Sequence, residues 1–155
     1  MATDQAQQSQ DCVICAKHRG EGPLKGELVG RRDEFWVYHA PPRDDGLAPL
    51  GELIIESDRH APYLSDLTDA EAAALGQLRS RLAEALRDEL GVELVFAAAI
   101  GRSVPHFHEF LFPRHPGVPP EIPWHKSDDA GPHGDADTVS DLVRRLRNRL
   151  PGMGS

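Results

Sequence analysis

The sequence of 155 residues has no long apolar segment and no apolar N-terminus. No stretch approaches the ~20 apolar residues that a membrane-spanning helix needs, so we expect neither a membrane anchor nor a membrane partner. The first ten residues are polar and lack the basic segment and apolar run of a signal peptide. The sequence therefore predicts a soluble, cytoplasmic protein.

Positive charge is also scarce, since 17 Lys and Arg stand against 25 Asp and Glu, for a formal net charge of −8. A surface that binds DNA or RNA along the phosphate backbone needs an excess of positive charge. This composition excludes a nucleic-acid polymer as the main partner. It is compatible with a small anionic ligand, because a local pocket can be electropositive on an acidic protein.

The chain length suits one domain, which at this size buries about 70% of its extended-chain surface. Residues 1–10 are small and polar without an apolar period, so they are predicted to be a disordered tail. Residues 11–150 are predicted to form a single domain.

Cysteine is nearly absent, and the only two cysteines occur as Cys12-Val13-Ile14-Cys15. This spacing lets both sulfurs reach one tetrahedral metal ion, which would make the pair half of a zinc site. A redox couple and two buried thiols are the alternatives. The cysteines alone do not decide among the three.

Residues 27–56 have the pattern of an antiparallel meander. Apolar segments at 27–30, 35–39 and 53–55 are separated by a polar turn and by a loop at 41–51 that is rich in Pro, Asp and Gly. A further apolar strand is predicted at 93–100, and residues 101–103 form a turn.

A long helix is predicted from Thr68 to Leu90. Thr68 and Glu71 match a capping box, and Gly91 supplies a left-handed stop. Its apolar stripe consists of Leu75, Leu78, Leu82, Leu86 and Leu90, which should face the sheet. A second helix is predicted at 137–150, after an irregular excursion at 115–137. Its arginines at 144–149 either bind phosphate or form a solvated helix face. These elements predict an α+β fold with an antiparallel sheet of about five strands, a long helix on one face and a C-terminal helix.

Residues 104–114 concentrate the chemistry of the chain. If they form one strand, then His106 and His108 point to the same face, and Phe110 and Phe112 continue that face. Two histidines on such a strand could be core residues with satisfied hydrogen bonds. The alternative is a pair of functional bases.

The run His106-Phe107-His108-Glu109-Phe110 followed by Pro113-Arg114 resembles the signature of the histidine triad (HIT) nucleotide hydrolases and transferases. The order of features over residues 11–115 is similar too, with a Cys-x-x-Cys, a meander that ends near Arg59-His60, a long helix and the paired-histidine strand. The resemblance implies a HIT-like fold and, as is usual in the family, a homodimer.

The resemblance also implies a zinc site. The zinc-containing branches of the family use two cysteines, a histidine after the third strand and the first triad histidine. The matching residues are Cys12, Cys15, His60 and His106. A Cys₂His₂ set is what tetrahedral zinc prefers, and such a site would be closed and structural.

The resemblance further assigns His108 as the nucleophile that attacks the α-phosphorus of a nucleotide and forms a nucleotidyl-histidine. That chemistry needs a neutral imidazole whose second nitrogen is held by an acceptor, which a backbone carbonyl can provide. Ser103 matches a family position that donates to the phosphate or leaving group, although an ordinary turn serine is the alternative.

Two positions depart from the family pattern and bear on substrate binding. Phe110 replaces the third triad histidine and cannot donate to phosphate, so about 2–4 kcal/mol of transition-state stabilisation is absent unless another donor replaces it. Glu52 stands where many members have a histidine, and a carboxylate there repels phosphate. The candidate replacement donors are Arg114, His39, His115 and His125.

Two functions are compatible with this sequence. The first is a HIT-type hydrolase or nucleotidyltransferase that acts through His108 on phosphoramidates, dinucleoside polyphosphates or nucleotide-sugar-like molecules. The second is a zinc-stabilised HIT-fold protein that binds a ligand or a protein without phosphoryl transfer.

Overall fold

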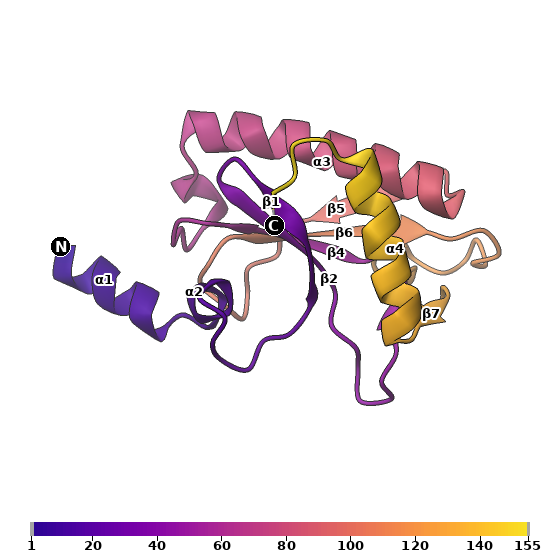
Figure 1. The fold of residues 1–155 in the computed structure, drawn as a ribbon, viewed down its shortest axis with the longest axis horizontal. Coiled ribbons are helices and arrows are strands. Elements are labelled where there is room, and N and C mark those ends of the chain that lie inside the picture. The colour runs from indigo at the N-terminus through magenta and orange to yellow at the C-terminus, as the bar shows by residue number, and fades with distance from the viewer. Residues whose placement is uncertain (1, 155) are drawn as a thin grey trace.

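The structure is a computed structural model that describes residues 2–154, and its centre is a five-stranded antiparallel sheet (Figure 1). The strand order is β1-β2-β4-β6-β5. The strands are β1 (Glu27–Arg32), β2 (Phe35–His39), β4 (Leu53–Ser57), β5 (Leu94–Ala98) and β6 (His108–Arg114). The predicted meander is confirmed as β1, β2 and β4. Within the described residues, no helix is both long and apolar enough to span a membrane.

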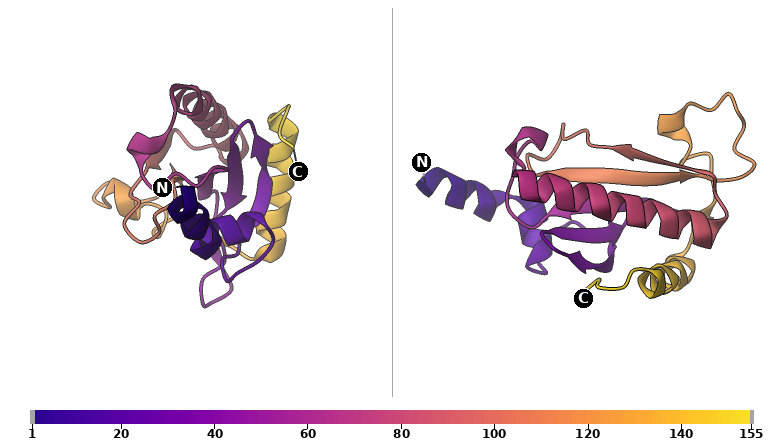
Figure 2. Two further views of the ribbon diagram at one scale, coloured as in Figure 1. Left: turned by 90° about the vertical axis from the view of Figure 1, so that its left-hand side faces the viewer. Right: turned by 90° about the horizontal axis from the view of Figure 1, so that it is seen from above.

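Two helices cover one face of the sheet, α3 (Asp69–Leu90) and α4 (Ala136–Arg149) (Figures 1 and 2). The predicted long helix is confirmed: the Thr68 hydroxyl accepts from the Glu71 amide, and Gly91 is left-handed with φ 62°. Leucines of both helices pack on β2, β4 and β6 in one core that includes Leu53, Ile55, Leu78, Leu82, Leu111, Leu142 and Leu146. The predicted α+β fold is therefore correct.

Shorter helices lie before the sheet in the chain. Helix α2 (Val13–His18) starts directly after Cys12, where the sequence did not predict a helix. Residues 1–10 were predicted as a disordered tail, and the structure has helix α1 (Ala2–Asp11) over the described part of this segment, extending beyond α2 (Figure 2). Most of the side chains described in α1 are exposed, and disorder of this segment in solution stays a prediction.

The histidine-bearing strand is shorter than predicted. Strand β6 begins at His108, so the expected strand over 104–114 is wrong for its first four residues, which form bends and a loop. His106 leaves the strand because its ring is turned toward the cysteines and its Nε2 bonds to the Ser57 carbonyl. The two histidines therefore belong to different local structures.

The excursion after β6 is irregular but tied to the fold. It contains η2 (Trp124–Lys126) and the short strand β7 (His133–Gly134), which pairs with β3 (Ala48–Pro49). The side chain of His115 donates from Nε2 to the Leu50 carbonyl at 2.7 Å. The short helix η1 (Leu64–Asp66) lies between β4 and α3.

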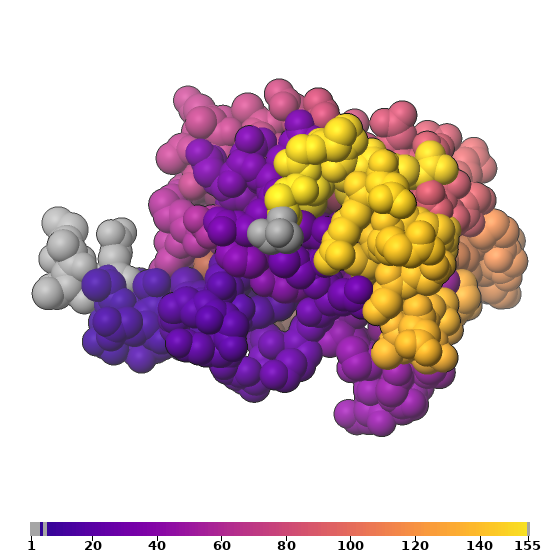
Figure 3. Space-filling model, viewed as in Figure 1, coloured from indigo at the N-terminus to yellow at the C-terminus, as the bar shows by residue number. Residues whose placement is uncertain are grey.

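The C-terminal segment covers the outer edge of β1, as the space-filling view shows for α4 and the residues after it (Figure 3). Gly154 forms an antiparallel bridge with Arg31, and its carbonyl lies 2.6 Å from the Arg31 amide. Arg147 donates to the carbonyls of Leu28 and Val29. Residues after 150 thus pack against the edge of β1.

Candidate metal centre and the histidine strand

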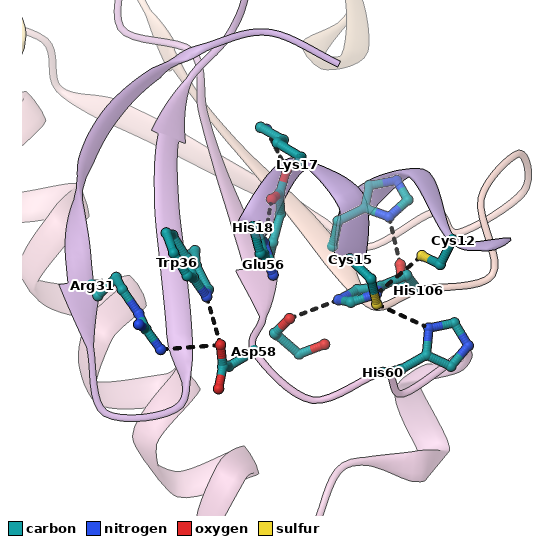
Figure 4. Close-up of polar contacts among 12 residues, drawn as sticks. Cys12, Cys15, Lys17, His18, Arg31, Trp36, Glu56, Asp58, His60 and His106 are labelled. Atoms are coloured by element: carbon teal, nitrogen blue, oxygen red, sulfur yellow. Dashed lines mark hydrogen bonds and ion pairs between the residues drawn. The ribbon is translucent and has the colours of Figure 1, made fainter. Parts of the chain in front are cut away.

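Cys12, Cys15, His60 and His106 come together in one cluster, as the sequence predicts (Figure 4). Their potential ligand atoms all lie within 4.8 Å of one another. The Nδ1 atom of His106 lies 3.4 Å from each sulfur, and the Nδ1 atom of His60 lies 3.5 Å from the Cys15 sulfur. Residues from the N-terminal segment, from the loop after β4 and from the loop before β6 thus meet at one point.

These separations fit a tetrahedral metal ion. Bonds of about 2.3 Å to sulfur and about 2.0–2.1 Å to nitrogen, at a tetrahedral angle, place S and N about 3.5 Å apart. His106 directs its Nε2 at the Ser57 carbonyl, 2.6 Å away. That bond fixes the tautomer and leaves Nδ1 free as a ligand atom.

Burial shapes the ionisation of this cluster in a way that favours a bound cation. It lowers the pKa of His106 to about 4 and also lowers the pKa of His60, so both rings are neutral and can ligate. Burial raises the pKa of the Cys15 thiol, so a thiolate at this position needs a positive neighbour. A metal ion supplies that charge. The four residues therefore form a candidate Cys₂His₂ metal site.

Neighbouring contacts hold the ligands in place. Arg59, next to His60, donates to both carboxylate oxygens of Glu71 at 2.9 and 2.8 Å. Glu71 is the same residue that closes the capping box of α3, because its carboxylate also accepts from the Thr68 amide. The His60 loop is thereby attached to the start of the long helix.

His108 has the environment that a nucleophilic imidazole needs. It is half-buried at the start of β6, and its Nδ1 lies 2.8 Å from the His106 carbonyl. Donation from Nδ1 to that carbonyl leaves Nε2 with a free lone pair. His108 also lines a small cavity together with residues 62–64 and 99–101.

Phe110 and Ser103 lie near His108 in different ways. The Phe110 ring meets the His108 ring edge-on, with centroids 5.6 Å apart, so an apolar group lies where the family has a third histidine. Ser103 lies in the bend before His106 and lines a neighbouring, larger cavity rather than the cavity that contains His108.

Two predicted substrate-binding residues lie away from His108. Glu56 is the β4 residue paired with His108, so Glu52, four residues earlier, is about 13 Å away along the strand. Burial and the neighbouring Asp128 raise the pKa of Glu52 to about 8, so its carboxyl group is mainly neutral at pH 7. Arg114, at the far end of β6, donates to the carbonyls of Ile122 and Pro119.

Two of the other candidate phosphate donors are already engaged. His39 is fully buried between the Ala40 carbonyl and the Gly51 amide, at 2.9 and 3.0 Å. His115 is buried and bonded to the Leu50 carbonyl. His125 is exposed on η2, where its ring meets Trp124 edge-on.

A buried polar cluster beside the candidate metal site was not predicted from the sequence (Figure 4). The buried Glu56 carboxylate accepts from Lys17 at 2.7 Å and from His18 at 2.9 Å. Burial raises the pKa of Glu56, but the hydrogen bond from His18 and the charge of Lys17 outweigh burial and hold this pKa below its ordinary value. The His18 ring stacks on Trp36 with centroids 4.6 Å apart. This cluster attaches α2, which carries Cys15, to the sheet.

Glu109 stands where the family signature usually has an apolar residue, and the fold explains its presence. It is buried on the helix-covered face of β6, where Arg79 of α3 donates to both of its carboxylate oxygens at 3.0 and 3.1 Å. The arginines of α4 are engaged as well, since Arg145 and Arg149 bind Glu89. A phosphate site on α4 therefore has no support.

Comparison with solved structures finds the same fold in several histidine triad proteins. A Hit-like protein involved in cell-cycle regulation from Bartonella henselae superposes with a TM-score of 0.67 at 15% identity, over 91% of this chain and 97% of that chain. A Zn-bound histidine triad family protein from Mycobacterium smegmatis superposes with a TM-score of 0.65 at 21% identity, over 91% of this chain and 94% of that chain. A histidine triad protein from Bradyrhizobium japonicum superposes with a TM-score of 0.66 at 22% identity, over 81% of this chain and 90% of that chain.

No family model and no curated protein matches the sequence. The likeness thus lies in the fold, at identities of 15–22% in these three structures. The chain therefore has the histidine triad fold, and one of its paired histidines, His106, belongs to the candidate metal site.

Proposed function

We propose that the protein is a HIT-type nucleotide hydrolase or nucleotidyltransferase that acts at the α-phosphate through His108. The observation that carries the proposal is the hydrogen bond from Nδ1 of His108 to the His106 carbonyl, which leaves the Nε2 lone pair available on a residue that lines a cavity. The same carbonyl can stabilise the positive charge that the ring acquires on attack.

In this reaction Nε2 of His108 attacks the α-phosphorus, and the bond from phosphorus to the leaving group breaks. The leaving group keeps the bonding electron pair and takes up a proton. Water or another acceptor then attacks the nucleotidyl-histidine, the P–N bond breaks, and Nε2 regains its lone pair. With water as acceptor, the product is a nucleoside monophosphate.

The apolar Phe110 ring predicts a slow or re-specialised enzyme. His39, His115 and Arg114 are engaged elsewhere, so three of the four candidate donors do not serve the phosphate. His125 lies beside Trp124, whose ring stacks on Phe112 four residues along β6 from His108. That is about 13 Å away, beyond direct contact with an α-phosphate on His108.

A binding protein without phosphoryl transfer is the second candidate. The contact of the Phe110 ring with His108 favours it, because that contact places no hydrogen-bond donor beside the imidazole. In this alternative, a ligand or a protein would occupy the His108 cavity without forming a bond to the ring.

We infer that the metal is zinc. Two thiolates and two neutral imidazoles are a preferred donor set of tetrahedral zinc, and the S···N separations of 3.4–3.5 Å fit it. With four protein ligands the site has no open position, so the ion would hold α2 and the loops of His60 and His106 together rather than take part in the reaction.

We further propose a homodimer formed through β5. The outer edge of β1 is covered by Arg147 and Gly154, whereas among the described residues no strand pairs with the outer edge of β5. Strand β5 is wholly apolar, and Leu94 is 49% exposed. An uncovered apolar edge strand favours pairing with a second copy.

Release of nucleoside monophosphate from adenosine and uridine 5′-phosphoramidates tests the enzymatic function. The wild type should release it, and His108→Ala should remove the release while the metal content stays unchanged. Equal rates in the wild type and in His108→Ala would contradict a role for His108. Thermal protection by nucleotide without any turnover would favour the binding protein.

A further inference from the structure

One side of the candidate metal site is open to a cavity. Cys12 and His60, two of the four candidate ligands, line a cavity of about 600 Å³. The other two ligands, Cys15 and His106, are not among the residues that line it. His106 is fully buried on the inner side, where its Nε2 bonds to the Ser57 carbonyl. A metal ion can therefore reach the site from this cavity, past Cys12 and His60.

The last turn of α1, residues 8–11, forms one wall of this cavity. Gln8 and Asp11 belong to the lining, next to Cys12. Among the described residues that line the cavity, Asp11 is the only acidic one, and none is a lysine or an arginine. A carboxylate attracts a divalent cation, and no positive side chain opposes it. The lining is therefore suited to the passage of a metal ion.

Ser9, in the same turn, contacts a candidate metal ligand directly. Its hydroxyl oxygen donates to the Cys15 sulfur, 3.5 Å away. Ser9 is half-buried, whereas the other side chains described in α1 are exposed. A hydroxyl that donates to a thiolate forms a charge-assisted hydrogen bond, which is stronger than a bond to a neutral thiol. A thiolate is also the form of cysteine that ligates a metal, so the Ser9 contact is strongest when metal is bound.

Helix α1 has few other means of attachment. It is ten residues long, and isolated helices shorter than about 12–15 residues are marginal in water. Its sequence contains no Leu, Ile, Val, Met or Phe, so it has no large apolar side chain to bury. Figure 2 shows its first turns extending away from the rest of the molecule. The position of its last turn therefore depends on contacts at that end, such as the one between Ser9 and Cys15.

We propose that the last turn of α1 closes the route by which a metal ion enters and leaves the site, with Ser9 as the positioning residue that attaches this turn to Cys15. The inference rests on the inferred metal and not on the reaction proposed for His108. By linkage, the closed turn should slow the loss of metal, and bound metal should favour the closed turn to the same extent. We expect the predicted disorder of residues 1–10 in the metal-free protein.

The rate of metal release from the full chain tests the inference. Zinc-loaded protein is mixed with an excess of the chromogenic chelator pyridylazoresorcinol, and the transfer of zinc is followed by absorbance. Ser9→Ala should release zinc about 10-fold faster than the wild type, the lower end of what loss of a contact to a metal ligand costs. Ser9→Thr keeps the hydroxyl and should stay within about 2-fold of the wild type.

A matched pair of substitutions at Gln10 tests closure by the turn itself. Gln10 is exposed and is not among the lining residues of the cavity. Proline at this position removes a helical N–H and disfavours the helical conformation of the preceding residue, Ser9. Gln10→Pro should therefore release zinc at least as fast as Ser9→Ala. Gln10→Ala is the control and should match the wild type.

Hydrogen exchange of the N-terminal peptide tests the reverse effect. In the wild type, the amides of residues 2–11 should exchange more slowly with zinc bound than after zinc has been removed. Ser9→Ala should abolish most of this difference. If α1 instead has a structural role that is independent of the metal, these amides will be protected equally in both states, and the inference is wrong.

The remaining outcomes are distinct. Both Ser9→Ala and Gln10→Pro must accelerate release, and the inference is wrong if either does not, while the metal assignment stands. If the wild type binds neither zinc nor cobalt, the metal assignment fails and the inference fails with it. Neither result depends on catalysis by His108, because release of zinc and exchange of α1 are measured without substrate.

Discussion

His106 directs Nδ1 at two thiols, whereas His108 directs Nδ1 at a carbonyl, although one residue separates them. Substitution of the two histidines should therefore have different effects on metal content and stability. His106→Ala should remove the metal and destabilise the fold by at least about 3 kcal/mol, a fall of roughly 6–12 °C in melting temperature for a chain of this length. His108→Ala should keep both the metal and the melting temperature.

Metal analysis and thermal melting check this pair of predictions. Cys12→Ser, which removes one candidate ligand, is the companion variant and should behave like His106→Ala. Purified wild type without zinc would contradict the assignment. So would similar unfolding of the His106 and His108 variants, because it would mean that the two histidines share one structural role.

Phe110 places an apolar ring beside His108 where a phosphate donor is expected. Phe110→His should add such a donor and raise the turnover of a phosphoramidate about 10²- to 10³-fold, which corresponds to about 3–4 kcal/mol in the barrier. Steady-state kinetics of the wild type and the variant measure this. A wild-type turnover of about 1 per second or faster, with no gain in the variant, would mean that another group already donates.

At the scale of elements, the ion pair of Arg59 and Glu71 joins the His60 loop to α3. The Arg59 guanidinium lowers the pKa of Glu71 from 4.5 to about 2. A carboxyl group with a depressed pKa in the folded state stabilises the fold above its unfolded pKa, and this contribution is lost as the pH falls.

The resulting prediction concerns Glu71→Gln. The wild type should melt at a higher temperature than the variant at pH 7, and the difference should shrink as the pH falls from about 4.5 to about 2. Thermal melts across this range measure the difference. A difference that is constant with pH would show that the carboxylate charge contributes nothing.

Local signals predicted the elements well wherever neighbouring residues decide the structure. Thr68 and Glu71 marked the start of α3, and Gly91 marked its end. The start of β6 was placed too early, because apolar alternation cannot reveal that His106 turns away to bond with Ser57, 49 residues earlier in the chain. The pairing of β3 with β7 has too few residues to leave a pattern.

The candidate site was predictable only in part, for a similar reason. The four candidate metal ligands follow from residue type and order, and the structure brings them together. The partners of Glu56 could not be predicted, because Lys17 and His18 lie 39 and 38 residues away in the sequence and meet Glu56 only when α2 packs beside β4. The distance between Glu52, which lies just before β4, and His108 depends on strand register, which the sequence leaves open.

At the scale of the whole molecule, the two sheet edges differ, since the C-terminal segment covers β1 but not β5. The protein should therefore be a dimer in solution, with twice the 17.0 kDa mass of one chain. Ala97→Lys places a charge on β5 and should give monomers, whereas Ala73→Lys on an exposed position of α3 should not. Light scattering after size exclusion measures this, and a monomeric wild type would contradict the pairing.

The covalent state of His108 tests the proposed function most directly. The protein is mixed with adenylated and uridylylated phosphoramidates, quenched during turnover and examined by intact-mass and peptide mass spectrometry. We predict a nucleotidyl adduct on the peptide that carries His108, with none in His108→Ala and no adduct on His106. Product release by the wild type without any adduct, or an adduct that persists in His108→Ala, would contradict the proposed role of His108.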